Sequence, residues 1–279
     1  MAITISVVAA VASQRIRLRM LTHIRPTAAR TFELSVKMPI DAWSRSTADA
    51  ETERLRHSVI PIIGADARRR PYLVGSAVVL VYRGRKVFVT AEHVLSDNVK
   101  VPLSFFGADG YSRPFRGDFV ISEAHDLAVK LLPPDEIDAL SHVPFIAEAI
   151  LGRAAGVGER FYAAVAGYPA TAAERKDKVT LDTPMEVYSN FATEQLDGSV
   201  SVIFDKNEGA VDRTGHINPR APFGKSGGAI FGLPVDGPHI KPQQSARLVG
   251  IPTRWKRGQK RIQGSSIAVV FPLLDQLVR

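Results

Sequence analysis

The chain has 279 residues and no cysteine. This absence excludes a disulfide-stapled fold, a cysteine nucleophile and a zinc site with cysteine ligands. It also suits a reducing compartment, so we expect a cytoplasmic protein. No stretch of about 18 residues is apolar and free of charge, so the sequence predicts no membrane-spanning helix and no membrane partner. Internal repeats and low-complexity tracts are lacking as well.

The composition is that of a globular protein, with 45% hydrophobic and 23% charged residues. A chain of this length can bury a core without covalent cross-links. Its formal net charge is +8, but the basic excess lies in residues 1–37 and 241–279, and residues 38–240 carry more acids than bases. This distribution argues against one broad nucleic-acid-binding surface, so nucleic acid remains a weak alternative partner.

The N-terminus allows three interpretations. Residues 2–12 are apolar like the core of a secretory signal, but no basic residue precedes them and Arg15 follows at once, which is wrong for a signal peptide. Export, a poorly ordered leader and a start at Met38 therefore stay open. We treat residues 1–57 as an N-terminal extension that is poorly ordered, with a helix-like run at 48–55.

From residue 58 the sequence consists of short β-branched apolar runs separated by turn residues, which predicts an all-β fold. A hairpin is expected where a Gly turn at 83–85 joins two such runs. We expect a first β-barrel over 58–150 and a second over 151–279, with a short helix at 133–140 and a C-terminal helix at 272–279. The expected strands are 58–63, 75–82, 86–95, 101–106, 115–124 and 126–132 in the first half, and 159–169, 178–189, 199–204, 227–233, 246–253 and 265–271 in the second.

Three short segments carry residue types suited to nucleophilic catalysis. They are Thr-Ala-Glu-His ending at His93, Asp-Leu-Ala beginning at Asp126, and Gly-Lys-Ser-Gly-Gly around Ser226. A serine hydroxyl is a weak nucleophile and needs a base to accept its proton, which an imidazole can do. A carboxylate can orient that imidazole and stabilise its protonated form.

Taken in the order His, Asp, Ser, these segments resemble the chymotrypsin/trypsin-like serine peptidases. Because it has no cysteine, the chain resembles the Cys-free, bacterial-type branch of that family. The resemblance covers residues 58–279 and includes the segments 165–169 and 248–253. It implies two six-stranded antiparallel β-barrels with a C-terminal helix, and a serine endopeptidase that works through an acyl-enzyme without a cofactor. The implied catalytic residues are His93, Asp126 and Ser226, and the implied oxyanion hole is formed by the N–H groups of Gly224 and Ser226.

The resemblance also implies how a peptide or protein substrate binds. The hydroxyl of Thr253 is expected to donate to Asp126, and the backbone of Thr253, Arg254 and Trp255 is expected to pair with the substrate as an added β-strand. The basic stretch 254–261 that follows is either a docking surface for acidic substrate segments or a solvated hairpin tip.

Two positions depart from the family pattern. Many trypsin-like members have Asp, which binds a newly freed amino terminus, where this chain has Lys225. We therefore expect no activation by N-terminal trimming, although a regulatory protein partner could order the loop. Arg220 stands at the position of the base of the specificity pocket, where it would repel Lys or Arg and favour an acidic side chain.

Three further expectations concern metal binding, His125 and a competing function. The histidines have no recognised metal-ligand spacing, so we expect no metal site. His125 is expected to point away from the site, because neighbours on a strand face opposite sides. A catalytically silent fold that binds peptides or proteins is the competing function, and reaction with a serine-directed probe would separate it from an enzyme.

Overall fold

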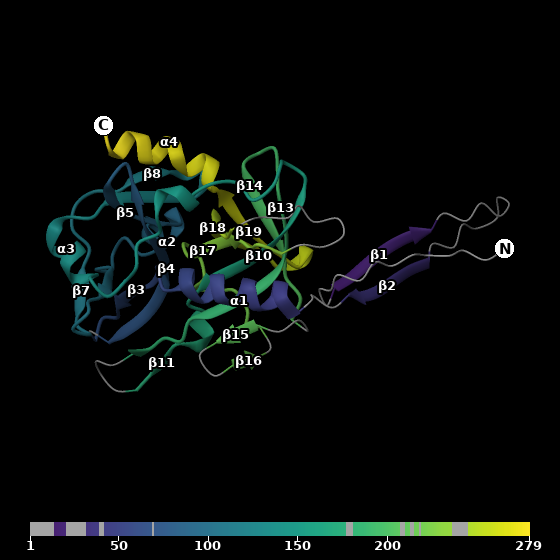
Figure 1. The fold of residues 1–279 in the computed structure, drawn as a ribbon. Helices are drawn as coiled ribbons and strands as arrows, with labels where there is room; N and C mark the ends of the chain where they lie inside the picture. The colour runs from purple at the N-terminus through teal and green to yellow at the C-terminus, as the bar shows by residue number, and fades with distance from the viewer. Residues whose placement is uncertain are drawn as a thin grey trace, which may run out of the picture.

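The structure is a computed structural model that describes residues 14–20, 32–38, 42–68, 70–176, 181–206, 210–212, 215–217, 219–235 and 245–279 (Figure 1). Its first two strands, β1 (Gln14–Met20) and β2 (Phe32–Met38), pair antiparallel. Helix α1 (Ala42–Arg56) follows, and its Ala48 and Leu55 are buried in the main hydrophobic core. The helix-like run expected at 48–55 lies within α1, and these apolar side chains pack onto the folded body.

The first half of the chain forms a seven-stranded antiparallel sheet in the order β7-β6-β3-β4-β5-β9-β8. Its end strands, β7 and β8, are three residues each and are not paired with one another in the described chain. This sheet has seven strands, where six were expected. The strands are β3 (Val59–Ala65), β4 (Pro71–Tyr82), β5 (Arg85–Thr90), β6 (Ser104–Phe106), β7 (Ser112–Pro114), β8 (Val120–Ser122) and β9 (Leu127–Leu131).

The expected hairpin is confirmed as the β4–β5 pair. Arg83 and Gly84 form its turn with φ values of 46° and 74°. Two consecutive residues with positive φ are typical of the turn whose twist matches that of paired strands. Strand β5 ends at Thr90, five residues before the expected end, and helix α2 (Glu92–Ser96) follows.

The second half forms a closed six-stranded antiparallel barrel, as expected. Strands β10, β17, β18, β19, β14 and β13 follow one another, and β13 pairs back with β10. Two short strands extend the sheet beyond β13, and β11 (Glu174–Arg175) and β12 (Leu181–Asp182) pair separately. The strands of the second sheet are β10 (Arg160–Gly167), β13 (Glu186–Glu194), β14 (Ser199–Ile203), β15 (Ala210–Asp212), β16 (Gly215–Ile217), β17 (Ala229–Gly232), β18 (Arg247–Lys256) and β19 (Arg261–Ser266).

The largest differences from the expected strands of the second half occur at two places. The strand expected at 178–189 runs from Glu186 to Glu194, and residues 177–180 lie outside the described residues. The strand expected at 265–271 ends at Ser266, and helix α4 (Ile267–Leu277) begins there, with the Ser266 side chain accepting from the N–H of Ala268. A short apolar run alone does not distinguish a buried strand from a buried helix, and the serine cap starts the helix.

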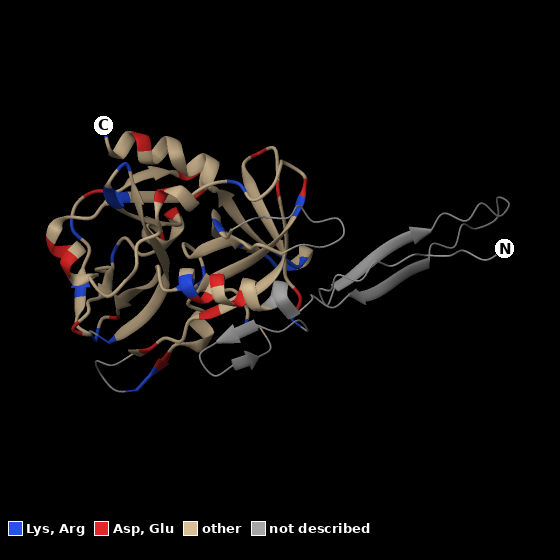
Figure 2. Ribbon diagram, viewed as in Figure 1, with Lys and Arg blue, Asp and Glu red and all other residues tan. Residues whose placement is uncertain are grey.

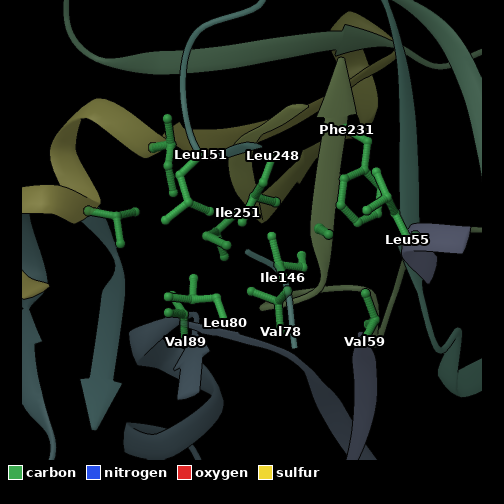
Figure 3. Close-up of a cluster of buried hydrophobic side chains, with 14 of the residues drawn as sticks. Leu55, Val59, Val78, Leu80, Val89, Ile146, Leu151, Phe231, Leu248 and Ile251 are labelled. Carbon is green, nitrogen blue, oxygen red and sulfur yellow. The ribbon is translucent and has the colours of Figure 1, made fainter. Parts of the chain in front are cut away.

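One hydrophobic core joins the two sheets. Figure 3 shows Val78, Leu80 and Val89 of the first sheet facing Phe231, Leu248 and Ile251 of the second. Helix α4 crosses the molecule and contacts β9 of the first sheet and β18 of the second (Figure 1). The Tyr82 hydroxyl donates to Asp275 of α4 over 2.7 Å. This shared packing holds the two sheets in a defined relation.

The remaining helices are short and lie in connections. Helix α3 (Pro134–Ala139) occupies the expected position, with Pro134 at its start and two acids in its first turn. The single-turn 3₁₀ helices are η1 (Glu123–His125), η2 (Glu148–Ile150), η3 (Ala170–Ala172) and η4 (Arg257–Gln259). None of the helices in the described chain is long and apolar enough to cross a membrane.

Candidate active site

His93 and Asp126 are held together by hydrogen bonds. The Nδ1 atom of His93 lies 2.9 Å from both carboxylate oxygens of Asp126, and the backbone N–H of His93 donates to Oδ1 over 3.0 Å. The neighbouring strands bring the two residues to this position, since Thr90 at the end of β5 is paired with Ala128 of β9. Asp126 adopts a left-handed conformation with φ of 52°, which turns its side chain toward α2.

The environment of His93 changes its basicity. The hydrogen bond to Asp126 raises the pKa of the imidazole above its usual 6.5, and partial burial opposes this effect. A carboxylate beside an imidazole stabilises the protonated ring. The His93 side chain is still one-third exposed.

The loop around Ser226 is attached to both sheets. The Ser226 carbonyl accepts the N–H of Ser76 in β4 over 2.9 Å, and the N–H of Gly227 donates to Pro252 of β18 over 2.8 Å. Ser226 Oγ donates to the carbonyl of Thr253 over 3.4 Å. It makes no hydrogen bond to His93 in the part of the chain that the structure describes.

Gly227 shows how closely this loop approaches the segment before His93. A Cβ atom at Gly227 would lie 2.1 Å from both the Ser76 carbonyl and Thr90 Oγ1, and 3.0 Å from the nitrogen of Ala91. Its φ of 82° also favours glycine. Only a residue without a side chain fits, so the glycine after the serine allows the loop to contact the segment that leads into α2.

The backbone N–H groups of the loop alternate in their bonding. Those of Lys225 and Gly227 donate to Pro222 and Pro252 over 3.1 and 2.8 Å. Those of Gly224 and Ser226 have no protein acceptor among the described residues. These two N–H groups are therefore available to a bound group.

Ser76 connects the loop to the first sheet in a way that the sequence did not suggest. Its hydroxyl donates to the Gly224 carbonyl over 2.9 Å and accepts the N–H of Tyr168 over 2.9 Å. With the backbone bond to Ser226, this residue contacts the loop at two points. No motif marks Ser76, because its partners lie about 90 and 150 positions away in the chain.

Lys225, the residue before Ser226, is buried and paired. Its Nζ lies 2.5 Å from Oε1 of Glu186 in β13, and both side chains are 1% exposed. The sequence drew attention to Lys225, but not to Glu186. No local signal links two residues 39 positions apart.

The expected substrate strand is partly open. Strand β17 pairs with β18 only as far as Gly250. Arg254 and Trp255 pair with Gln263 and Ile262 of β19, and Thr253 lies at a bulge between paired residues, so among the described residues this segment has a strand partner on the β19 side alone. Thr253 is buried and Arg254 is exposed. The expected bond from the Thr253 hydroxyl to Asp126 is not formed in the described chain.

An aromatic group lies beside this strand. Trp255 is half-buried, and its ring lies 5.1 Å from that of Phe223 and 5.8 Å from that of Phe204. Phe223 is 59% exposed and directly precedes Gly224. The sequence analysis missed Phe223, although an exposed aromatic residue beside the glycine-rich motif was the available signal.

Two other residues from the sequence analysis are exposed to different degrees. Arg220 has an exposed side chain, and its backbone N–H donates to Oε2 of Glu186 over 3.3 Å. His125 is half-buried in η1, and its carbonyl accepts the Ser265 hydroxyl. The strand argument for His125 does not apply, because β9 begins only at Leu127 and the preceding turn sets the direction of both side chains.

Within the described ranges, no group of three or more His, Asp or Glu residues could hold a metal ion.

No protein-family model matches the chain, and no curated protein matches it. Several solved structures do.

The serine protease domain of the Sesbania mosaic virus polyprotein is 14% identical, with a TM-score of 0.44, over 80% of this chain and 93% of that one. A chain from a study of coupled folding and binding by the disordered VPg protein of the same virus is 14% identical over 77% of this chain and 87% of that one, with a TM-score of 0.45. The MamO protease domain of Magnetospirillum magneticum is 14% identical over 78% of this chain and 96% of that one, with a TM-score of 0.42.

The architecture is that of a chymotrypsin-like fold: a closed six-stranded barrel, a preceding antiparallel sheet and a C-terminal helix. The fold by itself does not select the bacterial-type branch that the absence of cysteine led us to expect. A fold alone does not establish an activity. The case for chemistry in this chain therefore depends on its own residues.

Proposed function

We propose that the protein is a serine endopeptidase in which Ser226 is the nucleophile, His93 the general base and Asp126 the residue that orients it. Two contacts support the proposal: the imidazole of His93 is bound to Asp126, and Gly227, the residue after Ser226, packs against Thr90 and Ala91 just before His93. These are the groups that acyl transfer requires.

The reaction begins when Ser226 Oγ attacks the carbonyl carbon of the scissile peptide bond and its proton passes to Nε2 of His93. The hydroxyl rotates away from Thr253 to make this transfer, since catalytic hydrogen bonds often form only with substrate bound. The N–H groups of Gly224 and Ser226 bind the negatively charged oxygen of the tetrahedral intermediate.

His93 then gives its proton to the leaving amine, the C–N bond breaks, and the acyl group stays on Ser226. A water molecule, deprotonated by His93, attacks the ester, and Ser226 Oγ recovers its proton as the acid product leaves. No cofactor takes part in these steps. The backbone of Thr253–Trp255 pairs with the substrate as an added strand on its open edge.

The substrate is a protein or peptide with acidic side chains near the scissile bond. The exposed Arg220 and the basic turn between β18 and β19, blue in Figure 2, support this assignment. We also propose a cytoplasmic location and the Cys-free bacterial-type branch of the trypsin-like peptidases, both on the absence of cysteine.

A fluorophosphonate probe tests the proposal, because it reacts covalently with an activated serine. We expect the unmodified protein to be labelled at Ser226, Ser226→Ala to take up none, and His93→Ala to be labelled at least a hundredfold more slowly. Ser141→Ala is the matched control, because Ser141 is exposed in a turn after α3, and it should react like the unmodified protein. Equal labelling with and without Ser226 would end the hydrolase proposal.

A second function follows from the bond between Ser226 Oγ and the Thr253 carbonyl. If this bond persists with peptide bound, the serine is not activated and the protein is a catalytically silent peptide- or protein-binding module. A chain that binds peptides along β18 but takes up no probe would establish this alternative.

A further inference from the structure

The ion pair between Lys225 and Glu186 lies directly behind the nucleophile loop. Lys225 stands between Gly224 and Ser226, the two residues whose N–H groups are available. Its ammonium group and the Glu186 carboxylate are 2.5 Å apart and are 1% exposed. A buried charge that loses its partner is strongly unfavourable, so the pair restricts where the loop can go.

The Glu186 carboxylate contacts the loop at two points. Its Oε1 accepts from Lys225, and its Oε2 accepts the backbone N–H of Arg220 over 3.3 Å. One side chain of β13 therefore holds both the start and the end of the segment 220–225. In the β10–β13 ladder, Glu186 is paired with Gly167.

The Lys225 backbone also packs tightly on this ladder. A Cβ atom at Gly167 would lie 2.9 Å from both Cα and Cβ of Lys225. The glycine thus leaves the space that the loop occupies. The loop therefore packs against paired strands of the closed barrel, and the ion pair links Lys225 to the same ladder.

We propose that the Lys225–Glu186 ion pair positions the loop so that the N–H groups of Gly224 and Ser226 face the same oxygen atom. The proposal rests on the proposed function for the role of those two groups. The partner of Lys225 comes from within the folded barrel, so the loop is ordered without cleavage of the chain or a freed amino terminus. Lys225 and Glu186 are positioning residues, because neither touches the reacting atoms.

The test measures how fast a fluorophosphonate labels the folded protein, and compares the variants Lys225→Met and Glu186→Gln with the unmodified protein. Each change leaves one buried group without its charged partner. We expect each to slow labelling at least tenfold, and the charge-reversed double variant K225E/E186K to recover part of that loss. The apolar double variant K225M/E186L keeps the test usable if a single variant fails to fold, and we expect it to fold and to label slowly.

A matched control separates positioning from general stability. Lys130 and Glu136 form a second ion pair of 2.5 Å, with side chains 1% and 3% exposed, in the first sheet and α3. Lys130→Met should lower the melting temperature by an amount similar to that of Lys225→Met. We expect it to leave the labelling rate of the folded fraction within about twofold of the unmodified protein.

A second measurement does not depend on activity. The chain has two tryptophans, so Trp43→Phe leaves Trp255 as the sole reporter, 5.1 Å from the ring of Phe223 in the loop. Lys225→Met should shift the Trp255 emission, and Lys130→Met should not. If the starting protein takes up no probe, the proposed function fails while this shift still supports the ion pair as a positioning device.

The proposal would be overturned if K225M/E186L were labelled as fast as the unmodified protein. It would also be overturned if a folded single variant were labelled at that rate and showed unchanged Trp255 emission. So would an equal loss of labelling rate in Lys130→Met, because the effect would then be one of stability alone.

Discussion

His93 Nδ1 lies 2.9 Å from both carboxylate oxygens of Asp126, although the two residues are 33 positions apart. This contact raises the pKa of His93 above its usual 6.5. Only the neutral imidazole can accept the proton of Ser226. The rate of probe labelling should therefore increase with pH through an apparent pKa above 6.5.

Asp126→Asn tests this relationship. The variant removes the negative charge, so the pKa of His93 falls and the acidic limb of the rate profile moves to lower pH, while the maximal rate falls by about 10³–10⁴-fold. The exposed Asp118→Asn should change neither. An acidic limb that stays in place in Asp126→Asn would show that Asp126 does not set the basicity of His93.

The same pKa shift predicts a pH-dependent stability. Because the folded-state pKa of His93 is raised, the contribution to stability is fully present below pH 6.5 and is lost as the pH rises through the folded-state value. The difference in melting temperature between the unmodified protein and Asp126→Asn should accordingly be larger at pH 5.5 than at pH 9. An equal difference at both values would contradict this.

Gly227→Ala should destabilise the protein strongly. The added methyl group would lie 2.1 Å from Ser76 and Thr90 atoms, at a φ of 82°. Backbone strain and overpacking together lead us to expect a loss of about 3 kcal/mol or more in the free energy of unfolding. Urea denaturation measures it.

Gly84→Ala is the control for backbone strain. Gly84 has a φ of 74° and nothing within 4 Å of an added Cβ. It should lose only about 1 kcal/mol. Equal losses at the two glycines would show that the loop around Ser226 does not pack against β4 and β5 as described.

Arg220 should determine the charge preference of the proposed peptidase. Its side chain is exposed and its backbone is held by Glu186. We expect cleavage after Asp or Glu to exceed cleavage after Lys or Arg by at least tenfold in a peptide library, and Arg220→Glu to reduce or reverse this ratio. Arg85→Glu makes the same charge change at the far end of β5 from Thr90 and should leave the ratio unchanged. A preference for Lys or Arg in the unmodified protein would refute this role.

The basic turn between β18 and β19 should strengthen binding of acidic substrates. Replacing Lys256 and Arg257 by Gln removes two exposed charges beside the proposed substrate strand. We expect KM for an acidic peptide to rise about three- to tenfold, with kcat unchanged, and to depend less on salt, because exposed charges are screened by ions. Arg68→Gln with Arg85→Gln is the control. If both double variants behave alike, the turn is only a solvated hairpin tip.

Local sequence patterns predicted a large part of the fold and of the candidate site. Two short β-branched apolar runs and the turn at Arg83 and Gly84 predicted the β4–β5 hairpin, because these signals act between neighbours in the chain. The same patterns misplaced the boundary at Ser266, where a buried strand passes directly into a buried helix. They also did not reveal β7, the strand beyond the six expected in the first sheet, since its three residues are all exposed and form no apolar run.

By itself, the sequence determined the residue types available for chemistry: His93, Asp126 and Ser226 stand in motifs whose glycines and short side chains are local requirements. Only the tertiary structure decided which partners they have. It pairs Lys225 with Glu186, and it brings the Ser76 hydroxyl to the Gly224 carbonyl. It also brings the Ser226 hydroxyl to the Thr253 carbonyl. Contacts of this kind depend on how two sheets pack across a shared core, and no neighbouring residue in the chain encodes them.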